Sequence, residues 1–312
     1  MAVKEEAGKQ ILAGVSRSFY LTLRMLPSPM RPAASLGYLL ARASDTLADS
    51  TTTSIESRLT FLEQFRRAVA GDRALPRWPV SLLNAVPDVR ERKLLEACGD
   101  LIGWLHQLPT GEGILVREVV DTIIGGQKLD VERFAHASRE HPVALQDEAA
   151  LEDYTWRVAG CVGEFWTKLG FLTMSERFSI STEADLLERG SAYGKGLQLV
   201  NILRDVGEDL ANGRCYLPVS DMHDITGLLA SHRKWQAVAI QRMKEGERYA
   251  ATLQSRFLRA ATVLPALIGR KTLESLTNQN WEQLQERTKV RRSFVYQSLF
   301  LAFTRAPDSM SR

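Results

Sequence analysis

The chain has 312 residues, of which 45% are hydrophobic and 25% are charged, the composition of a soluble globular protein with a large core. Its 40 basic and 37 acidic residues leave a net charge of +3, which argues against a nucleic-acid partner. The cysteine spacing fits neither a disulfide framework nor a CxxC metal site. The sequence shows no signal peptide and no run of about 20 apolar residues. We therefore expect a cytoplasmic protein without a membrane span.

Apolar residues recur every three or four positions along most of the chain, which is the spacing of one face of an α-helix. In chain order, helices are predicted over residues 33–49, 57–70, 90–108, 113–127, 148–171, 184–212, 233–260, 263–278 and 291–304. Proline and glycine cluster at 26–33, 71–81 and 213–221, and alternating strand patterns are hard to find. We therefore expect an all-α protein, a single large helical bundle that occupies residues 1–312.

Two pairs of aspartates share one spacing. Asp45 and Asp49 are four residues apart, and so are Asp205 and Asp209. On a helix, both carboxylates of a pair project from the same face, about 6 Å apart along the axis. Glu208 lies beside the second pair but about 80° from its midline. A solvated acidic face would explain either pair taken alone.

Each pair also continues a polar stripe at spacings of three and four. The two stripes consist of Tyr38, Arg42, Asp45 and Asp49, and of Gln198, Asn201, Asp205 and Asp209. Two such stripes facing each other in a bundle would hold hard divalent cations such as Mg²⁺, which bind carboxylate, water and phosphate oxygens. Arg42 and Arg204 lie next to the acids and can contact phosphate. The pattern favours a magnesium-assisted ionisation of an allylic diphosphate.

Four blocks together resemble the squalene/phytoene synthase family, whose members join two prenyl diphosphates head to head. The blocks are SRSFYLTLRMLP (16–27), YLLARASDTLAD (38–49), YTWRVAGCVGEFW (154–166) and GLQLVNILRDVGEDLANGRCYLP (196–218). The resemblance covers residues of about 15–295 and implies a helical bundle of the isoprenoid synthase type with a central apolar cleft.

The resemblance also implies roles for individual residues. Mg²⁺, or Mn²⁺ in its place, would be bound by Asp45, Asp49, Asn201, Asp205 and Asp209. The prenyl diphosphates would be contacted by Ser16, Arg17, Tyr38, Arg42, Gln198, Asn201 and Arg204. NADPH would be contacted by Arg17, Arg42, Arg204, Lys289 and Arg291. Tyr154 would lie near the reacting carbons and act in catalysis with the four aspartates, while Gly160 and Gly163 would leave room for the prenyl chains.

Within the family, Asp-Thr-x-x-Asp at 45–49 and Lys-x-Arg at 289–291 resemble squalene synthases, whereas 201–218 is closer to phytoene synthases and bacterial enzymes. Ala48 stands where squalene synthases commonly carry a further acid, which leaves the number of Mg²⁺ ions open. We expect a squalene synthase that converts two farnesyl diphosphates through presqualene diphosphate to squalene with NADPH. The alternatives are a dehydrosqualene or phytoene synthase, an enzyme that releases presqualene diphosphate, and a non-catalytic helical partner protein. Peripheral membrane contact would serve release of the apolar product, and the oligomeric state stays open.

Overall fold

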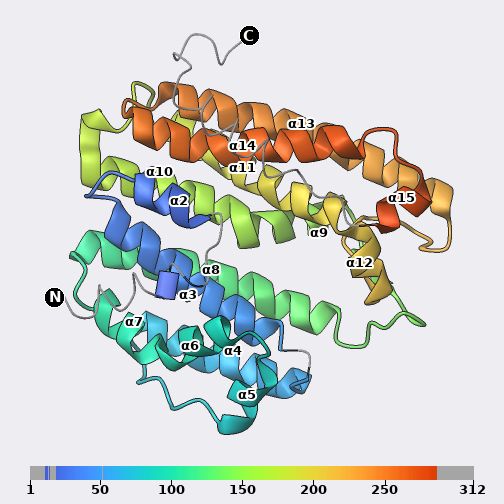
Figure 1. Cartoon of the computed structure of the whole chain (residues 1–312), viewed down its shortest axis with the longest axis horizontal. Coiled ribbons are helices and arrows are strands. Elements are labelled where there is room, and N and C mark those ends of the chain that lie inside the picture. Colours follow the sequence, from blue (N-terminus) through green and yellow to red (C-terminus); the bar gives the residue numbers. More distant parts are fainter. Residues whose placement is uncertain (1–10, 13, 15–18, 51, 287–312) are drawn as a thin grey trace. The chain divides into compact units, whose positions relative to one another are not determined.

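Helices account for most of the residues that a computed structural model of the chain describes, namely 11–12, 14, 19–50 and 52–286, so the all-α prediction is confirmed (Figure 1). The chain forms two compact units. Unit 1 comprises Met1–Glu132 and Lys168–Ser175, and unit 2 comprises Arg133–Thr167 and Glu176–Arg312. The first aspartate pair belongs to unit 1 and the second to unit 2. A single domain over residues 1–312 stays a prediction.

Unit 1 contains the helices from the N-terminal third of the chain. In order they are α2 (Phe19–Met25), α3 (Arg31–Ala48), α4 (Ile55–Ala70), α5 (Val80–Ala85), α6 (Val89–Glu96), α7 (Cys98–Leu105) and α8 (Thr110–Arg133), whose last residue belongs to unit 2. The predicted helix over 90–108 is divided at Ala97 into α6 and α7. α3 packs against α4, α6 and α7.

Local sequence explains where the helices around the first aspartate pair begin and end. Proline in the first turn of α3 suits a position whose N–H needs no intrahelical partner. α4 begins at Ser54, whose side chain accepts a hydrogen bond from the backbone N–H of Ser57. It ends at Gly71, whose φ of 93° is readily adopted only by glycine. The buried face of α3 carries Leu36, Leu39, Leu40 and Leu47, each fully removed from solvent.

Unit 2 contains the remaining described elements. They are β1 (Val143–Ala144), α9 (Glu148–Thr155), a π-helical turn η1 (Trp156–Gly160), α10 (Cys161–Met174), a 3₁₀ turn η2 (Ser175–Arg177), α11 (Glu183–Arg204), α12 (Val206–Ala211), β2 (Arg214–Cys215), α13 (Ile225–Thr252), α14 (Arg256–Leu276) and α15 (Trp281–Gln285). α10 and η2 extend across the boundary into unit 1. The predicted helix over 148–171 is interrupted by the π-helical turn that begins at Trp156. The break predicted between the helices 233–260 and 263–278 occurs earlier, at Leu253–Ser255, between α13 and α14.

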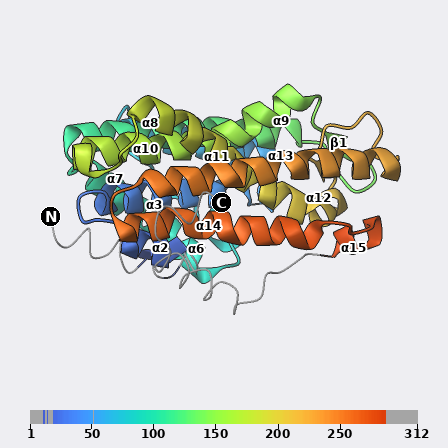
Figure 2. The same ribbon diagram turned by 90° about the horizontal axis from the view of Figure 1, so that it is seen from above.

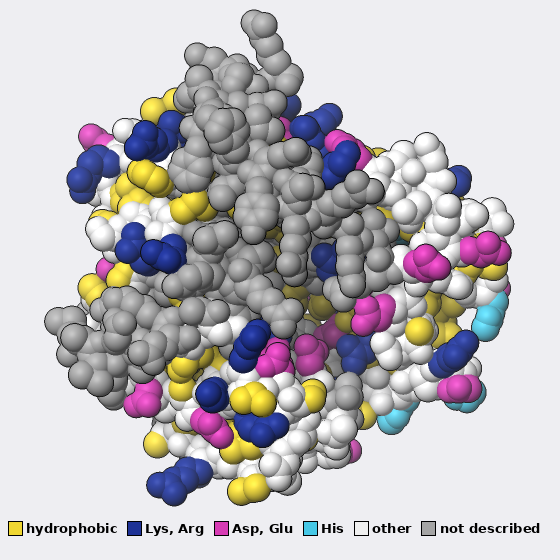
Figure 3. Space-filling model, viewed as in Figure 1, with side chains coloured by type: hydrophobic (Ala, Val, Ile, Leu, Met, Phe, Trp, Pro, Cys, Tyr) yellow, Lys and Arg dark blue, Asp and Glu magenta, His cyan; other side chains and the backbone are white. Residues whose placement is uncertain are grey.

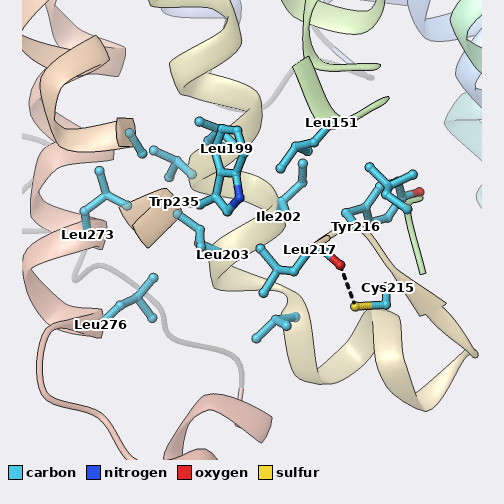
Figure 4. Packing of buried hydrophobic residues seen from close by; sticks show 14 of the residues in the cluster. Leu151, Leu199, Ile202, Leu203, Cys215, Tyr216, Leu217, Trp235, Leu273 and Leu276 are labelled. Atoms are coloured by element: carbon cyan, nitrogen blue, oxygen red, sulfur yellow. Dashed lines mark hydrogen bonds between the residues drawn. The ribbon is translucent and has the colours of Figure 1, made fainter. Parts of the chain in front are cut away.

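The core of unit 2 forms where α11 lies alongside α13 and α14, as both ribbon views show (Figure 2). Figure 4 shows Leu199 and Leu203 of α11 on the side of Trp235 of α13 and Leu273 of α14, and Ile202 on the other side of α11, toward Leu151 of α9. Each fully buried leucine contributes about 1.5–3 kcal/mol through the hydrophobic effect. This packing holds the C-terminal half of α11, which carries Gln198 and Asn201 of the second polar stripe.

β1 and β2 form one short parallel pair, in which Val143 is opposite Arg214. β2 follows Gly213 directly. This glycine has a φ of 78°, and its N–H donates to the carbonyl oxygen of Leu210, so the predicted helix end at Gly213 is confirmed. The predicted helix over 291–304 lies outside the described residues.

None of the helices that the structure describes is long and apolar enough to cross a membrane. On the face seen in Figure 3, basic and acidic side chains are intermixed, as the balanced totals suggest.

Candidate functional site

The first aspartate motif lies at the end of a continuous helix. Asp45 is in the last turn of α3, and Asp49 follows the helix directly. The backbone N–H of Asp49 donates to the carbonyl oxygen of Asp45 at 2.8 Å, so the helical spacing extends to the second acid. Asp49 is exposed, and the side chain of Asp45 is 45% exposed. The pair thus has the spacing that the sequence predicts.

Asp45 is contacted by two different kinds of side chain. Nε2 of Gln127, from α8, donates a hydrogen bond of 2.5 Å to its Oδ1. A guanidinium nitrogen of Arg42 lies 3.8 Å from its Oδ2. Partial burial and the Asp49 carboxylate nevertheless raise the pKa of Asp45 to about 7. Its carboxylate is therefore only weakly compensated by the protein.

Arg42 is shared between two carboxylates. Besides Asp45, it pairs with Glu91 of α6, whose side chain is 23% exposed. Burial lowers the pKa of Arg42, but the carboxylates of Glu91 and Asp45 outweigh it and raise that pKa. A predicted diphosphate contact of this arginine would compete with both acids. The sequence offered no signal for Glu91 or Gln127, because neither is near the motif in the chain.

The second aspartate motif lies at a break in a helix. α11 ends at Arg204 and α12 begins at Val206, while Asp205 between them has φ −102° and ψ 11°. The predicted unbroken helix over 184–212 is therefore wrong at this residue. Helical hydrogen bonds still run from Asp205 N to Asn201 O and from Asp209 N to Asp205 O, each at 2.9 Å. The backbone of the motif is thus kinked without losing its i,i+4 spacing.

Arg204 and Asp205 form a bidentate ion pair. Nε of Arg204 lies 2.9 Å from Oδ1 of Asp205, and a terminal nitrogen lies 2.5 Å from Oδ2. The bound Asp205 carboxylate raises the pKa of Arg204. The Asp205 side chain is only 18% exposed. Two residues predicted to bind metal and diphosphate are thus paired with each other.

The rest of the second stripe is partly connected by hydrogen bonds. The Asn201 amide donates to the side-chain oxygen of Gln198 at 3.4 Å. Nε2 of His232, from α13, lies 3.1 Å from the carbonyl oxygen of Leu203, next to the helix break. His232 is 2% exposed, and its burial lowers the pKa of the imidazole. The neutral ring with its proton on Nε2 can donate to that carbonyl, which supports the last turn of α11.

Tyr154 lies in a stack of aromatic rings in unit 2. Its ring stacks on Tyr216 at 4.9 Å with an interplanar angle of 23°. Phe134 packs edge-on against Tyr216 at 5.2 Å. Figure 4 shows Tyr216 next to Cys215 and Leu217, after β2. The stack holds the ring of Tyr154 in place, and no sequence pattern singled out Tyr216 as its partner.

A comparison with known proteins bears on these motifs. The model of a family described as squalene/phytoene synthase matches residues 12–293. The chain belongs to the squalene/phytoene synthase family. Its members are prenyltransferases that join prenyl diphosphates head to head. The matched range contains both aspartate motifs and Tyr154.

Individual relatives agree with this assignment. Presqualene diphosphate synthase of Rhodopseudomonas palustris is 33% identical over 72% of this chain and 66% of its own length. Squalene synthase of Saccharomyces cerevisiae is 27% identical over 67% of this chain and 44% of its own length. The chain thus spans less than two thirds of the length of either relative. A structure of TcSQS with the ligand E5700 has a TM-score of 0.80 at 23% identity, covering 99% of this chain and 89% of that one, which confirms the isoprenoid synthase fold.

Two glycines of the central block, Gly160 and Gly163, lie where α11 packs against η1 and α10. A Cβ on Gly163 would lie 1.9 Å from the carbonyl oxygen of Gly190 on α11. A Cβ on Gly160 would lie 3.0–3.3 Å from side-chain atoms of Trp156, Lys195 and Ser191. The space beside both glycines is therefore filled by protein. The expectation that they leave room for prenyl chains is wrong, because their missing side chains let α11 approach.

The metal fit can be tested on the first motif. Carboxylate and amide oxygens are the ligands that Mg²⁺ accepts, and Gln127 holds a buried amide oxygen without a hydrogen-bond partner among the described residues. Within those same residues, no three His, Cys, Asp or Glu side chains form a ready metal cage. The donor set therefore fits a cation that keeps waters or phosphate oxygens as its other ligands. Mg²⁺ is such a cation.

Four of the predicted contacts, Ser16, Arg17, Lys289 and Arg291, lie outside the described residues. Tyr38 of α3 is half-buried next to Arg42.

Unit 1 also has an open groove of about 530 Å³, which is lined in part by Glu63, Arg67 and Lys128. Both cations pair with Glu63, so the groove is charged and internally compensated. It is not the predicted apolar cleft, which stays a prediction.

Proposed function

We propose that this chain condenses two molecules of farnesyl diphosphate head to head through presqualene diphosphate and reduces the product to squalene with NADPH. The observation that carries the proposal is the pair of aspartate motifs, each with an arginine in contact with its first acid. The family assignment supports the head-to-head reaction, and the Asp-Thr-x-x-Asp form of the first motif supports the squalene branch.

In this proposal the carboxylates hold the diphosphate groups through Mg²⁺. Asp45 and Asp49 would bind it in the first motif, and Asn201, Asp205 and Asp209 in the second. Bound Mg²⁺ supplies a Lewis acid that neutralises the departing diphosphate. Arg42 and Arg204 would add hydrogen bonds to the phosphate oxygens by exchanging part of their present pairing with Glu91 and Asp205.

Tyr154 is proposed to act at the reacting carbons. Ionisation of one farnesyl diphosphate releases diphosphate, and the allylic C1 cation is attacked by the 2,3 double bond of the second substrate. The cyclopropane ring then closes between C1 of the ionised substrate and C3 of the second substrate, and the same C1 loses a proton. The released diphosphate would take up this proton through Tyr154: the phenol oxygen, held by the stack on Tyr216, accepts the proton from C1 while its own O–H proton passes to a diphosphate oxygen. One diphosphate and one proton thus leave for each presqualene diphosphate formed.

The second half of the reaction is where candidate functions differ. Bound NADPH would supply the hydride that converts the second cation to squalene. Lys289 and Arg291, proposed to bind it, lie outside the described residues. A second candidate, release of presqualene diphosphate, is favoured by the bacterial relative named for that product at 33% identity. A third, loss of a proton to give a dehydrosqualene or phytoene-type product, would need no reductant.

Product analysis separates these candidates. The full chain is incubated with farnesyl or geranylgeranyl diphosphate and Mg²⁺, each with and without NADPH, and the extracted products are identified by mass spectrometry. Squalene that forms only with NADPH supports the proposal. Presqualene diphosphate under both conditions would assign the chain to the second candidate, and a triene under both conditions to the third. An absence of every C30 and C40 product would contradict the head-to-head reaction.

A further inference from the structure

Gln127 is a buried polar side chain in the middle of α8 that none of the recognised motifs includes. It belongs to the segment GGQKLD, which fits no dinucleotide-binding pattern because no strand precedes it. Gln127 is only 6% exposed to solvent. A glutamine at such a depth requires partners for both ends of its amide.

The donor end of this amide has a specific partner. Nε2 of Gln127 donates to Oδ1 of Asp45 at 2.5 Å, across 82 residues of sequence. The contact fixes one oxygen of the candidate metal ligand and leaves Oδ2 facing Arg42 at 3.8 Å. A neutral donor suits this task, because it orients the carboxylate without cancelling its charge, as a second arginine would.

The acceptor end is the unexplained part. Oε1 of Gln127 is buried and has no hydrogen-bond partner among the residues that the structure describes. An amide oxygen can accept two hydrogen bonds, and a buried one without a partner is costly. Hydrated Mg²⁺ retains several waters, and each of them donates hydrogen bonds. A cation on Asp45 would therefore place donors near this oxygen.

Another buried glutamine shows what a purely structural amide looks like in the same chain. Gln236 of α13 is 7% exposed, and its Nε2 donates to the carbonyl oxygen of Leu273 at 2.7 Å and to the Thr277 hydroxyl at 3.0 Å. Both of its partners join α13 to the C-terminal end of α14. Gln127 differs because its donor is directed to a candidate ligand and its acceptor is left open.

We propose that Gln127 is a positioning residue of the metal site: its amide N–H orients Asp45, and its amide oxygen accepts a hydrogen bond from a water bound to the cation. The inference rests on the proposed metal role of Asp45. It predicts that loss of the amide weakens cation binding by about 10–100-fold, the range found for groups that orient metal ligands.

The test measures Mn²⁺ binding to the full chain with inorganic diphosphate present, from the electron paramagnetic resonance signal of free Mn²⁺. The variants are Gln127→Met, which keeps the length without either polar atom, Gln127→Asn, which withdraws the amide by one methylene, and Asp45→Asn. Gln236→Leu is the matched control for loss of a buried amide. We expect weaker binding in the Gln127 and Asp45 variants and wild-type affinity in Gln236→Leu.

The outcomes distinguish the role of Gln127 from the metal role of Asp45. Wild-type affinity in Gln127→Met with weakened binding in Asp45→Asn would overturn the role of Gln127 and leave the proposed function intact. Wild-type affinity in both would remove the metal role of the first motif itself. Equal weakening in Gln236→Leu would mean that the loss follows from destabilisation, and would also overturn the inference.

A second measurement avoids any folding defect of the variants. In wild-type protein labelled with ¹⁵N, the side-chain amide resonance of Gln127 is identified by its absence in Gln127→Met or Gln127→Asn. Titration with Mg²⁺ and inorganic diphosphate should shift this resonance while that of Gln236 stays in place. A Gln127 resonance that does not move at saturating Mg²⁺ would overturn the proposal.

Discussion

The two aspartate motifs have the same spacing and opposite electrostatic surroundings. In the first, Asp45 receives a neutral amide hydrogen bond from Gln127, and its nearest arginine is shared with Glu91. In the second, Asp205 is bound bidentately by the neighbouring Arg204. The first carboxylate is under-compensated and the second is already neutralised. Two motifs with the same aspartate spacing therefore differ in how much of their carboxylate charge the protein compensates.

The difference has a physical consequence for cation binding. A cation at Asp45 would relieve the repulsion that Asp49 exerts, whereas one at Asp205 would have to share the carboxylate with Arg204 or displace it. Displaced arginine nitrogens are then free to bind phosphate oxygens. We therefore expect the first motif to respond to the metal alone and the second to respond when metal and diphosphate arrive together.

The largest effect is expected on activity. Asp45→Asn and Asp205→Asn should each lower kcat/KM by about 100-fold or more, because each removes a ligand for the metal that neutralises the leaving group. Release of radiolabelled diphosphate from farnesyl diphosphate measures this. Glu208→Gln is the control, since Glu208 is exposed and off the stripe. An equal loss in Glu208→Gln would show that net charge, and not the stripe, matters.

The next effect concerns what holds the second motif. α11 approaches α10 through Gly163 and Gly190, so Gly163→Ala should lower the free energy of unfolding by about 2–3 kcal/mol by overpacking. Gly99→Ala is the control, because a Cβ there meets nothing within 4 Å and a helical alanine is favoured by about 0.5–1 kcal/mol. Urea denaturation measures both. Full stability in Gly163→Ala would restore the view that the glycine leaves space for substrate.

Stability should change in opposite directions in the two aspartate variants. Asp205→Asn leaves the half-buried Arg204 without its charged partner and should cost about 1.5–3 kcal/mol at neutral pH. Asp45→Asn removes repulsion with Asp49 and should leave the metal-free protein equally or slightly more stable. Thermal unfolding in the presence of a chelator compares them. A loss of the same size in both variants would remove the contrast between the motifs.

The smallest effect is a pH dependence from the first motif. The pKa of Asp45 is raised from 3.8 to about 7, so the folded state holds this proton more tightly than the unfolded state does. The associated stability is present below about pH 4 and is lost as the pH rises through about 7. Between about pH 5 and about pH 8, the Tm of the metal-free wild type should fall relative to that of Asp45→Asn. Parallel Tm profiles would show that Asp45 titrates normally.

The sequence alone determined that the chain is helical and where several of its helices begin and end. The period of apolar residues predicted α3 and α4 with ends within two residues of those observed, and it predicted the presence of α8 and α11 but not their C-terminal ends. Gly213 ended its helix as expected. These features depend on neighbours within a few positions, so local spacing contains the information. The spacing of each aspartate pair follows in the same way, and the pattern of both pairs together with the four blocks was enough to indicate the family.

Only the tertiary structure decided what surrounds those residues. Gln127 contacts Asp45 from 82 residues away, Glu91 pairs with Arg42 from another helix, and Tyr216 stacks on Tyr154. The kink at Asp205 and the contact of Gly163 with Gly190 likewise require neighbouring helices to be in place. Such contacts are fixed by how helices pack, and packing leaves no periodic signal in the sequence. The sequence therefore specified which acids are present, and the fold specified how strongly each is compensated.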